Sequence, residues 1–359
     1  MPSILHRLVL CAHDSLILLL GLTFALWIWL STFSAGNIVP ILSLLFLKPF
    51  APWMHEVFLD CLAGVSWNSI IEYAERVCKF KTIVTGNLAE LMVRYPGNKL
   101  ILCNHVSAVD VLVIFFVASK YGKTGNLRFF AKKELIFVPI FGLAAYFLNF
   151  VFLERNWIKD MSRIRQKLLE IVGSSRKRSF WLVIFPEGTR IDNSKLKKSQ
   201  EFAISRNLQP LKHLLIPRVK GPSMSIQILK EEIDSILDLT IAYDKRYGDY
   251  GNTRPSLVDA FLKRKIEWKV HVNADLIPVS DIPQDQESLD DWLHQIFVQK
   301  DQKLERFHAD GVFPARPCNF DVLPGYQPFI HIIVYTLVAA FGLWTFVQGI
   351  SSIVAYARH

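Results

Sequence analysis

The sequence has little cysteine and lacks the signatures of several large enzyme classes. Its 359 residues include five cysteines. None stand in Cys-x-x-Cys spacing, which excludes a zinc framework or a disulfide scaffold and suits a reducing compartment. No Gly-x-Ser-x-Gly elbow is present, so a serine hydrolase of the α/β type lacks its nucleophile. The glycine loops of P-loop and dinucleotide-binding folds are missing, and no histidine or cysteine cluster has metal spacing.

Asp, Glu, Lys and Arg are absent from three long stretches of the chain. The first two run from Ser15 to Leu47 and from Phe329 to Tyr356. A helix that crosses a bilayer needs about 20 apolar residues, so both stretches predict membrane helices. The first is too long for a signal peptide and predicts a retained anchor. The third, Leu135 to Leu153, contains Pro139 and Gly142, and it predicts a short helix followed by a strand instead of a span.

The overall composition favours contact with lipids. Hydrophobic residues make up 51% of the chain, the mean hydropathy is +0.27, the formal net charge is +9 and the pI is near 9.2. Positive charge beside apolar stretches indicates anionic headgroups or anionic substrates as partners. Nucleic acid is excluded as a partner, because the apolar stretches do not fit an ordinary nucleic-acid-binding domain. The distribution of Lys and Arg around the stretches favours a cytosolic catalytic domain.

Strand and helix signals alternate through the middle of the chain. This alternation predicts an α/β domain with a mixed, largely parallel sheet and helices on both faces. Glu267 to Ala274 alternates polar and apolar residues, which predicts a half-buried edge or antiparallel strand. Ser288 and Asp291 predict the capping box of a helix from Ser288 to His308. Further strands are expected at Ile83–Val84, Leu100–Cys103, Phe129–Lys133, Trp181–Phe185, His213–Ile216 and Leu237–Tyr243, and helices at Val109–Ala118 and Trp157–Val172.

Two polar segments follow strand-like runs, at the positions where α/β folds keep their sites. In the first, His105 lies just before a helix that Ser107 would cap, and Asp110 follows in the first turn. An Asp110–His105 contact across this turn would give a base for removing a proton from a hydroxyl. The alternative is that Ser107 and Asp110 form only a capping box and that His105 is an incidental loop residue.

The second polar segment is Phe185-Pro186-Glu187-Gly188-Thr189-Arg190. A glutamate and an arginine on a glycine turn could hold a polar partner that carries phosphate. Glu187 is an acceptor only when ionised, so it should meet a hydroxyl or an arginine rather than phosphate. The alternative is a surface turn with a Glu–Arg pair.

Together these blocks resemble the glycerolipid acyltransferases of the 1-acylglycerol-3-phosphate acyltransferase family. That family carries a His-x4-Asp block and a Phe-Pro-Glu-Gly-Thr-Arg block, both met here. Between them lies an apolar strand ending in a basic residue, here Phe152 to Arg155. After them lies an apolar strand ending in proline, here in the segment Leu215 to Arg218, where the role of Arg218 stays open. The resemblance covers roughly residues 70 to 310. Ala131 to Leu135 and Leu239 to Tyr243 look most like the eukaryotic branch that includes the lysocardiolipin acyltransferases.

The resemblance implies roles for individual residues. His105 would be the catalytic base and Asp110 would fix its tautomer. The substrate-binding set would be Glu187, Gly188, Thr189, Arg190, Arg155, Lys132 and Pro217. Arg190 would be the bidentate phosphate ligand, with Arg155 as the second candidate. Lys132 could add positive potential or be solvated surface, and the role of Glu154 stays open.

These observations predict an acyl-CoA-dependent O-acyltransferase that acylates the hydroxyl of lysophosphatidate or a related lysoglycerophospholipid. The alternatives are a remodelling enzyme for lysophosphatidylinositol or lysocardiolipin, and a catalytically silent membrane scaffold. Residues 1–65 would form a membrane anchor, 66–310 the catalytic domain, and 311–359 a linker and membrane helix. The expected partners are acyl-CoA, the lysophospholipid and membrane lipids, with no cofactor, metal or protein partner. The expected location is the endoplasmic reticulum membrane.

Overall fold

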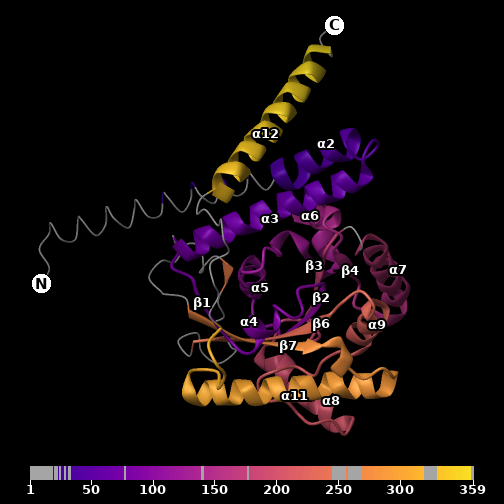
Figure 1. The fold of residues 1–359 in the computed structure, drawn as a ribbon, viewed down its shortest axis with the longest axis vertical. Coiled ribbons are helices and arrows are strands. Elements are labelled where there is room, and N and C mark those ends of the chain that lie inside the picture. Colours follow the sequence, from indigo (N-terminus) through magenta and orange to yellow (C-terminus); the bar gives the residue numbers. More distant parts are fainter. Residues whose placement is uncertain are drawn as a thin grey trace, which may run out of the picture.

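The computed structural model describes residues 34–76, 78–138, 141–175, 178–244, 256–257, 269–318 and 330–356, together with residues 19, 23, 26, 27 and 30. Within these residues, a seven-stranded sheet in the order β1-β7-β6-β2-β5-β3-β4 forms the centre of the molecule (Figure 1). All neighbouring strands run parallel except β6 and β7. The strands are β1 (Lys81–Thr85), β2 (Lys99–Cys103), β3 (Leu127–Lys132), β4 (Val151–Leu153), β5 (Trp181–Ile184), β6 (Ser235–Tyr243) and β7 (Lys269–Pro278). The predicted mixed sheet is confirmed.

Helices cover both faces of the sheet because the buried strands are apolar on both sides. Ile101 and Cys103 of β2 pack in one core with α3, α5 and α6, whereas Leu100 and Leu102 pack in a second core with α7, α9 and α11. These helices are α3 (Pro52–Arg76), α5 (Asp110–Ser119), α6 (Phe141–Phe147), α7 (Trp157–Ser175), α9 (Lys220–Leu229) and α11 (Gln286–Asp310). The others are α2 (Val39–Phe46), α4 (Leu88–Leu91), α8 (Asn193–Ser205) and α12 (Ile330–Tyr356), with short turns at Ser34–Ile38, Thr124–Asn126, Lys133–Phe137 and Val279–Asp281.

The predicted N- and C-terminal membrane helices need correction. Much of the stretch Ser15 to Leu47 lies outside the described residues. Among the residues that are described, no helix, α12 included, is long and apolar enough to cross a membrane. Part of the apolar pattern instead serves packing between helices: Ala339 of α12 is buried, and its carbonyl accepts a hydrogen bond from Ser34 Oγ at 2.7 Å.

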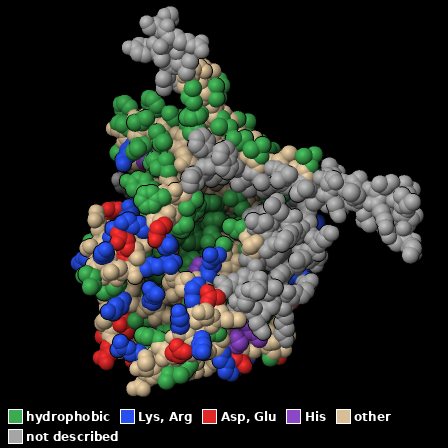
Figure 2. All heavy atoms as spheres, turned by 180° about the vertical axis from the view of Figure 1, so that it is seen from behind, with side chains coloured by type: hydrophobic (Ala, Val, Ile, Leu, Met, Phe, Trp, Pro, Cys, Tyr) green, Lys and Arg blue, Asp and Glu red, His purple; other side chains and the backbone are tan. Residues whose placement is uncertain are grey.

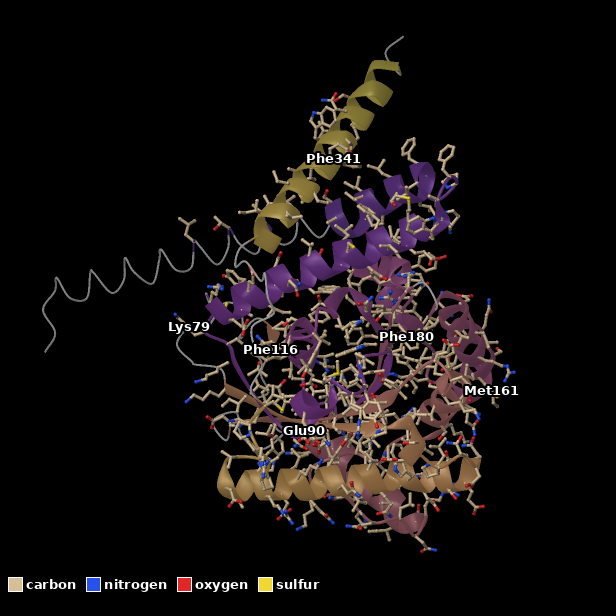
Figure 3. The ribbon with its side chains drawn as sticks, in the orientation of Figure 1. Lys79, Glu90, Phe116, Met161, Phe180 and Phe341 are labelled. Atoms are coloured by element: carbon tan, nitrogen blue, oxygen red, sulfur yellow. The ribbon has the colours of Figure 1, made fainter. Side chains whose placement is uncertain are left out.

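Side chains show how differently the two ends of the molecule are packed (Figure 3). Phe116 and Phe180 are buried on opposite faces of the sheet. Phe341, by contrast, lies on α12 and is 58% exposed. The helices α2, α3 and α12 expose further large apolar residues: Phe46, Trp53, Met54, Leu337 and Trp344.

The stretch Leu135 to Leu153 folds as predicted from its proline and glycine. Its described part contains the short helix α6 and the strand β4, with no span. The predicted domain boundary at residue 65 falls inside α3, whose Ala63 and Ile71 pack in the same core. Beyond the second boundary, Cys318 N donates to Val84 O at 2.8 Å, so residues up to 318 remain attached to β1.

Two local predictions were wrong in detail, and a third was confirmed in one of its two alternatives. His213–Ile216 is not a strand, because its amides bond to side chains: His213 N donates to Asp301 and Leu215 N to Glu187. Of the two alternatives for the segment from Glu267, the antiparallel strand is confirmed: β7 is antiparallel to β6 and lies between β1 and β6. Helix α11 begins earlier than expected, with Asp285 as its cap accepting from Ser288 N at 2.9 Å.

Candidate active site

The loop that follows β2 is held against β6 by an asparagine. Asn104 is fully buried, and its amide nitrogen donates to Ile241 O at 3.0 Å while its amide oxygen accepts from Ile241 N at 2.7 Å. The side chain thus replaces a pair of strand hydrogen bonds where β2 ends. This clamp fixes the start of the loop that carries His105.

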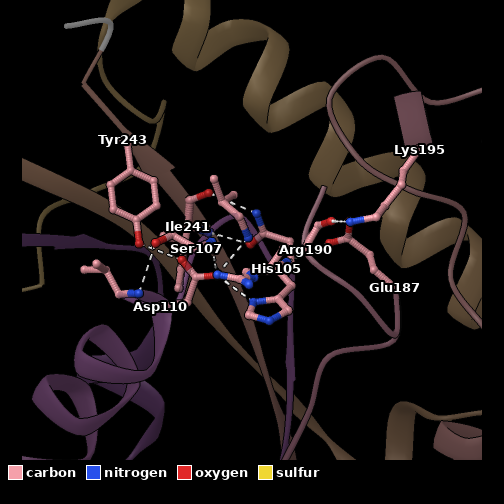
Figure 4. A network of polar contacts seen from close by, with 11 residues as sticks. His105, Ser107, Asp110, Glu187, Arg190, Lys195, Ile241 and Tyr243 are labelled. Atoms are coloured by element: carbon pink, nitrogen blue, oxygen red, sulfur yellow. Dashed lines mark hydrogen bonds and ion pairs between the residues drawn. The ribbon is translucent and has the colours of Figure 1, made fainter. Parts of the chain in front are cut away.

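His105 and Asp110 form a direct contact across the turn, as the spacing predicted. His105 Nδ1 lies 2.9 Å from Asp110 Oδ2, and the same oxygen accepts from Val106 N at 2.8 Å and Ser107 N at 2.9 Å (Figure 4). Asp110 is the first residue of α5, where a carboxylate is favoured by the helix dipole. Because an ionised carboxylate only accepts, Nδ1 carries the proton and Nε2 remains as the basic nitrogen.

A tyrosine outside the motif donates a further hydrogen bond to the Asp110 carboxylate. Tyr243 lies at the end of β6, and its hydroxyl donates to Asp110 Oδ1 at 2.6 Å. Burial, and secondly the nearby Asp110 carboxylate, raises the pKa of Tyr243 well above its usual value, so the hydroxyl stays a donor. Asp110 is fully buried, and both of its oxygens are occupied. The carboxylate is therefore held in one orientation relative to His105.

The imidazole of His105 lines a large cavity. Its ring stacks on Phe185 with centroids 4.2 Å apart, and its side chain is 20% exposed. The cavity has a volume of about 1010 Å³. Its apolar wall includes Trp67, Phe115, Phe129, Phe141 and Phe150, and its basic residues include Lys132, Arg155, Lys198, Arg206, Arg218 and Lys220. Figure 2 shows the hollow with an apolar interior and Lys and Arg side chains gathered on one side of its mouth.

Cys103 lies two positions before this histidine, but its environment makes the thiol inert. The thiol is fully buried at the end of β2, and burial raises its pKa well above the usual value. A buried neutral thiol is a poor nucleophile. Cys103 is therefore not a candidate nucleophile for this site.

Glu187 connects the two predicted blocks through the main chain. Its Oε1 accepts from His105 N at 2.7 Å, and its Oε2 accepts from Leu215 N at 3.1 Å. Burial raises the pKa of Glu187 to about 8, while the amides of His105 and Leu215 act in the opposite direction. Although Glu187 borders the cavity, both oxygens are occupied by amides, so the side chain positions the loops around His105.

Replacing Glu187 by glutamine is expected to lower the free energy of unfolding by about 1–3 kcal/mol, because one buried amide loses its acceptor. The native pKa near 8 lies above the unfolded value of 4.5, so this group stabilises the fold most below pH 4.5 and loses that contribution as pH rises towards 8. Glu187→Gln should flatten this part of the pH dependence in urea unfolding. Exposed Glu201 provides the matched control, Glu201→Gln. Unchanged stability and slope in Glu187→Gln would contradict the main-chain role.

The turn after Glu187 requires a glycine and brings Arg218 to the cavity, whereas Arg190 lies outside it. Gly188 has φ +68°, and a Cβ there would lie 3.3 Å from Cδ and Nε of Arg218. Arg218 thus packs over the turn and lines the cavity. Arg190 is exposed and does not line the cavity, although its carbonyl accepts from Lys195 Nζ at 2.9 Å.

Four other residues of the predicted substrate-binding set lie around the same cavity. Lys132, Arg155, Thr189 and Pro217 all line the cavity with His105. Lys132 also lies 3.0 Å from Glu134, with both side chains largely exposed. Glu154, whose role was open, accepts from Lys133 and Arg163 instead of facing the substrate space. The binding roles of these residues stay predictions.

Comparisons with known proteins agree with the motifs. The family model described as Acyltransferase matches residues 86–217, and the one described as Acyltransferase C-terminus matches residues 260–334. The 1-acyl-sn-glycerol-3-phosphate acyltransferase gamma of Mus musculus is 30% identical over 252 residues, which are 70% of this chain and 63% of that protein. The delta protein of Mus musculus is 32% identical over 61% of this chain and 56% of its own length. The 1-acyl-sn-glycerol-3-phosphate acyltransferase 2 of Brassica napus is 33% identical over 61% of this chain and 54% of its own.

Among solved structures, the 1-acyl-sn-glycerophosphate acyltransferase of Thermotoga maritima aligns with 82% of this chain and 97% of its own, with a TM-score of 0.44 and 17% identity. The chain spans between 54% and 63% of the length of the three curated relatives above. The Acyltransferase match contains His105, Asp110, Glu187 and Arg190. From the motifs, the family models and the curated relatives, the chain belongs to the 1-acylglycerol-3-phosphate acyltransferase family.

Proposed function

We propose that this protein transfers an acyl group from acyl-CoA to the free hydroxyl of a lysoglycerophospholipid, with lysophosphatidate as the first candidate. The observation that carries the proposal is the His105–Asp110 pair, 2.9 Å apart, at a cavity with an apolar wall and a group of cations. An apolar wall suits acyl chains, and arginine suits a phosphate. The names of the relatives support lysophosphatidate as acceptor.

In the proposed reaction, His105 Nε2 accepts the proton of the lysolipid hydroxyl. The hydroxyl oxygen then attacks the thioester carbonyl, and the coenzyme A thiolate leaves with the C–S bonding pair. The proton held by the imidazole returns to that thiolate or to solvent, which restores the neutral base. Asp110 stabilises the imidazolium while it exists. No acyl-enzyme is required, because the lipid hydroxyl is the nucleophile, and no cofactor is part of the proposal.

Acylation of a panel of lysolipids by the purified protein tests this proposal. We expect transfer from acyl-CoA to lysophosphatidate, measured as ester product, with less transfer to lysophosphatidylinositol and lysocardiolipin. Faster transfer to either of the latter would assign the enzyme to remodelling instead. No ester from any lysolipid, with only hydrolysis of the thioester, would contradict acyl transfer. The endoplasmic reticulum location stays a prediction.

Replacing Arg218 by alanine is expected to raise the apparent KM for lysophosphatidate about tenfold or more. Arg218 lies over the Gly188 turn at the cavity, and loss of one charge-assisted hydrogen bond costs about 1.5–3 kcal/mol. Arg190→Ala is the matched variant, because Arg190 is exposed outside the cavity lining. A larger KM effect in Arg190→Ala than in Arg218→Ala would restore Arg190 as the phosphate ligand.

Replacing Tyr243 by phenylalanine is expected to move the acidic limb of the pH–rate profile to higher pH. Without the hydroxyl donor, more negative charge remains on Asp110, which favours the protonated imidazole of His105. The maximal rate should fall by about threefold to tenfold, and the melting temperature should fall slightly because Oδ1 loses a buried partner. A lower melting temperature with an unmoved pH profile would reduce Tyr243 to a structural residue.

A further inference from the structure

Helix α8 presents one face to the cavity. Lys195, Lys198, Ser199 and Phe202 line it, and Arg206 continues the same row just after the helix. Residues three and four apart lie on the same side of a helix, so these side chains form one stripe. Lys197 and Ile204 lie on α8 outside this stripe and do not line the cavity. The stripe is not used by the proposed chemistry at His105.

The composition of the stripe is unusual for a helix surface. The Phe202 side chain is 50% exposed, although a large aromatic ring is ordinarily buried. The Arg206 guanidinium lies 5.9 Å from the centroid of this ring, and Lys198 is exposed one turn before it. An open aromatic ring between two cations is suited to stacking a nucleobase and pairing with its phosphates.

Helix α8 is fixed to the loops of the candidate active site. Ser199 Oγ accepts from Ile216 N at 2.8 Å, and Gln200 Nε2 donates to Leu211 O at 2.8 Å. Just before the helix, Ile191 N donates to His105 O at 3.0 Å. Since these bonds reach both flanking segments, the stripe keeps a fixed position relative to His105.

The cavity is chemically polarised between its two ends. The apolar end is lined by aromatic residues of α3, α5 and β3, such as Trp67, Phe115 and Phe129. In Figure 1, α3 and α8 lie on opposite sides of the sheet. A ligand with an apolar chain at one end and a charged aromatic group at the other would match both ends at once.

We propose that the α8 stripe binds the adenosine nucleotide of acyl-CoA, with Phe202 stacking on the adenine and Lys198 and Arg206 pairing with its phosphates. The inference rests on the proposed function, because acyl-CoA is the donor there. The same cations would also suit an anionic lipid headgroup. A lipid headgroup would be expected beside an apolar surface, but the apolar helices α2 and α12 lie at the end of the molecule away from α8 (Figure 1). A soluble nucleotide therefore fits α8 better.

Kinetics with two acyl donors test the stripe. Phe202→Ala and Lys198→Ala should each raise the KM for acyl-CoA about tenfold, the size expected when one stacked base or paired phosphate is lost. The KM for lysophosphatidate should not change. Activity with an acyl-pantetheine donor, which carries the thioester but no nucleotide, should also stay unchanged. Ile204→Ala and Lys197→Ala are the matched controls on the same helix and should behave as wild type.

Direct binding separates failure of this inference from failure of the proposed function. Adenosine 3′,5′-bisphosphate should bind the wild-type protein in calorimetry and bind Phe202→Ala about tenfold more weakly, and this readout requires no turnover. If Phe202→Ala and Lys198→Ala lose activity equally with acyl-CoA and acyl-pantetheine, or raise only the KM for the lysolipid, the nucleotide site is overturned while acyl transfer stands. If these variants lose binding to anionic vesicles but bind the bisphosphate as wild type does, the stripe is a site for lipid headgroups, and the nucleotide site is likewise overturned.

Discussion

Replacing His105 by alanine is expected to lower the rate of acyl transfer by about 10² to 10⁴, the usual contribution of a positioned general base. The imidazole of His105 lines the cavity. Its Nδ1 is hydrogen-bonded to Asp110, so its Nε2 is the nitrogen that can accept a proton. Initial rates of ester formation from acyl-CoA and lysophosphatidate measure the effect. The loss should appear in kcat, because the proton is transferred only in the chemical step.

The melting temperature of His105→Ala provides the control. Its side chain stacks on Phe185 at the cavity surface, and the anchoring bond to Glu187 comes from the main chain, which alanine keeps. The fold should therefore survive the substitution. Purified His105→Ala protein with near-wild-type kcat would refute the proposed base.

Replacing Asp110 by asparagine is the second change with a large expected effect. Asparagine can place its oxygen where Oδ2 accepts from Val106, Ser107 and His105, and its amide can donate to the Tyr243 oxygen. The geometry is kept, but the negative charge that stabilises an imidazolium is lost. We expect kcat to fall by about 10³ to 10⁴, the order seen when the carboxylate of a serine-protease triad is amidated.

Asp110→Ala serves as the contrast to this variant. Alanine leaves four donors without their acceptor, three of them buried, so its melting temperature should fall well below that of Asp110→Asn. Similar melting temperatures for Asp110→Asn and wild type, with a large difference in kcat, would assign the effect to charge. An Asp110→Asn variant with full activity would show that the carboxylate only caps α5.

The strands that carry the two motifs could be predicted from sequence because they are continuous apolar runs. β2 and β5 are buried on both faces, and this favours such runs. His213–Ile216 looked similar but is not a strand. Carboxylates far along the chain, on Asp301 and Glu187, take up amides that a sheet would otherwise pair. Such bonds arise from tertiary structure and leave no trace in local patterning.

The same distinction applies to the candidate site. The His105–Asp110 contact is local, five positions apart, so spacing alone could indicate it. Tyr243 reaches Asp110 only because β6 lies beside β2 in the sheet, a neighbour relation that the sequence does not encode locally. Arg218 lines the cavity, and Arg190 does not, because Arg218 packs over Gly188, which depends on how two loops meet. The row of residues on α8 was missed as well, because no helix was predicted over Asn193–Ser205.

The order of strands in the sheet has a consequence for how this protein is synthesised. β1 is made early, yet its partner in the described sheet is β7, at residues 269–278. A growing chain therefore carries β1 unpaired until most of the sequence has left the ribosome. A fragment that stops at residue 217, where the Acyltransferase match ends, would also lack β6 and leave an edge of β2 open. Open strand edges promote aggregation, so expression of that segment alone should yield insoluble protein.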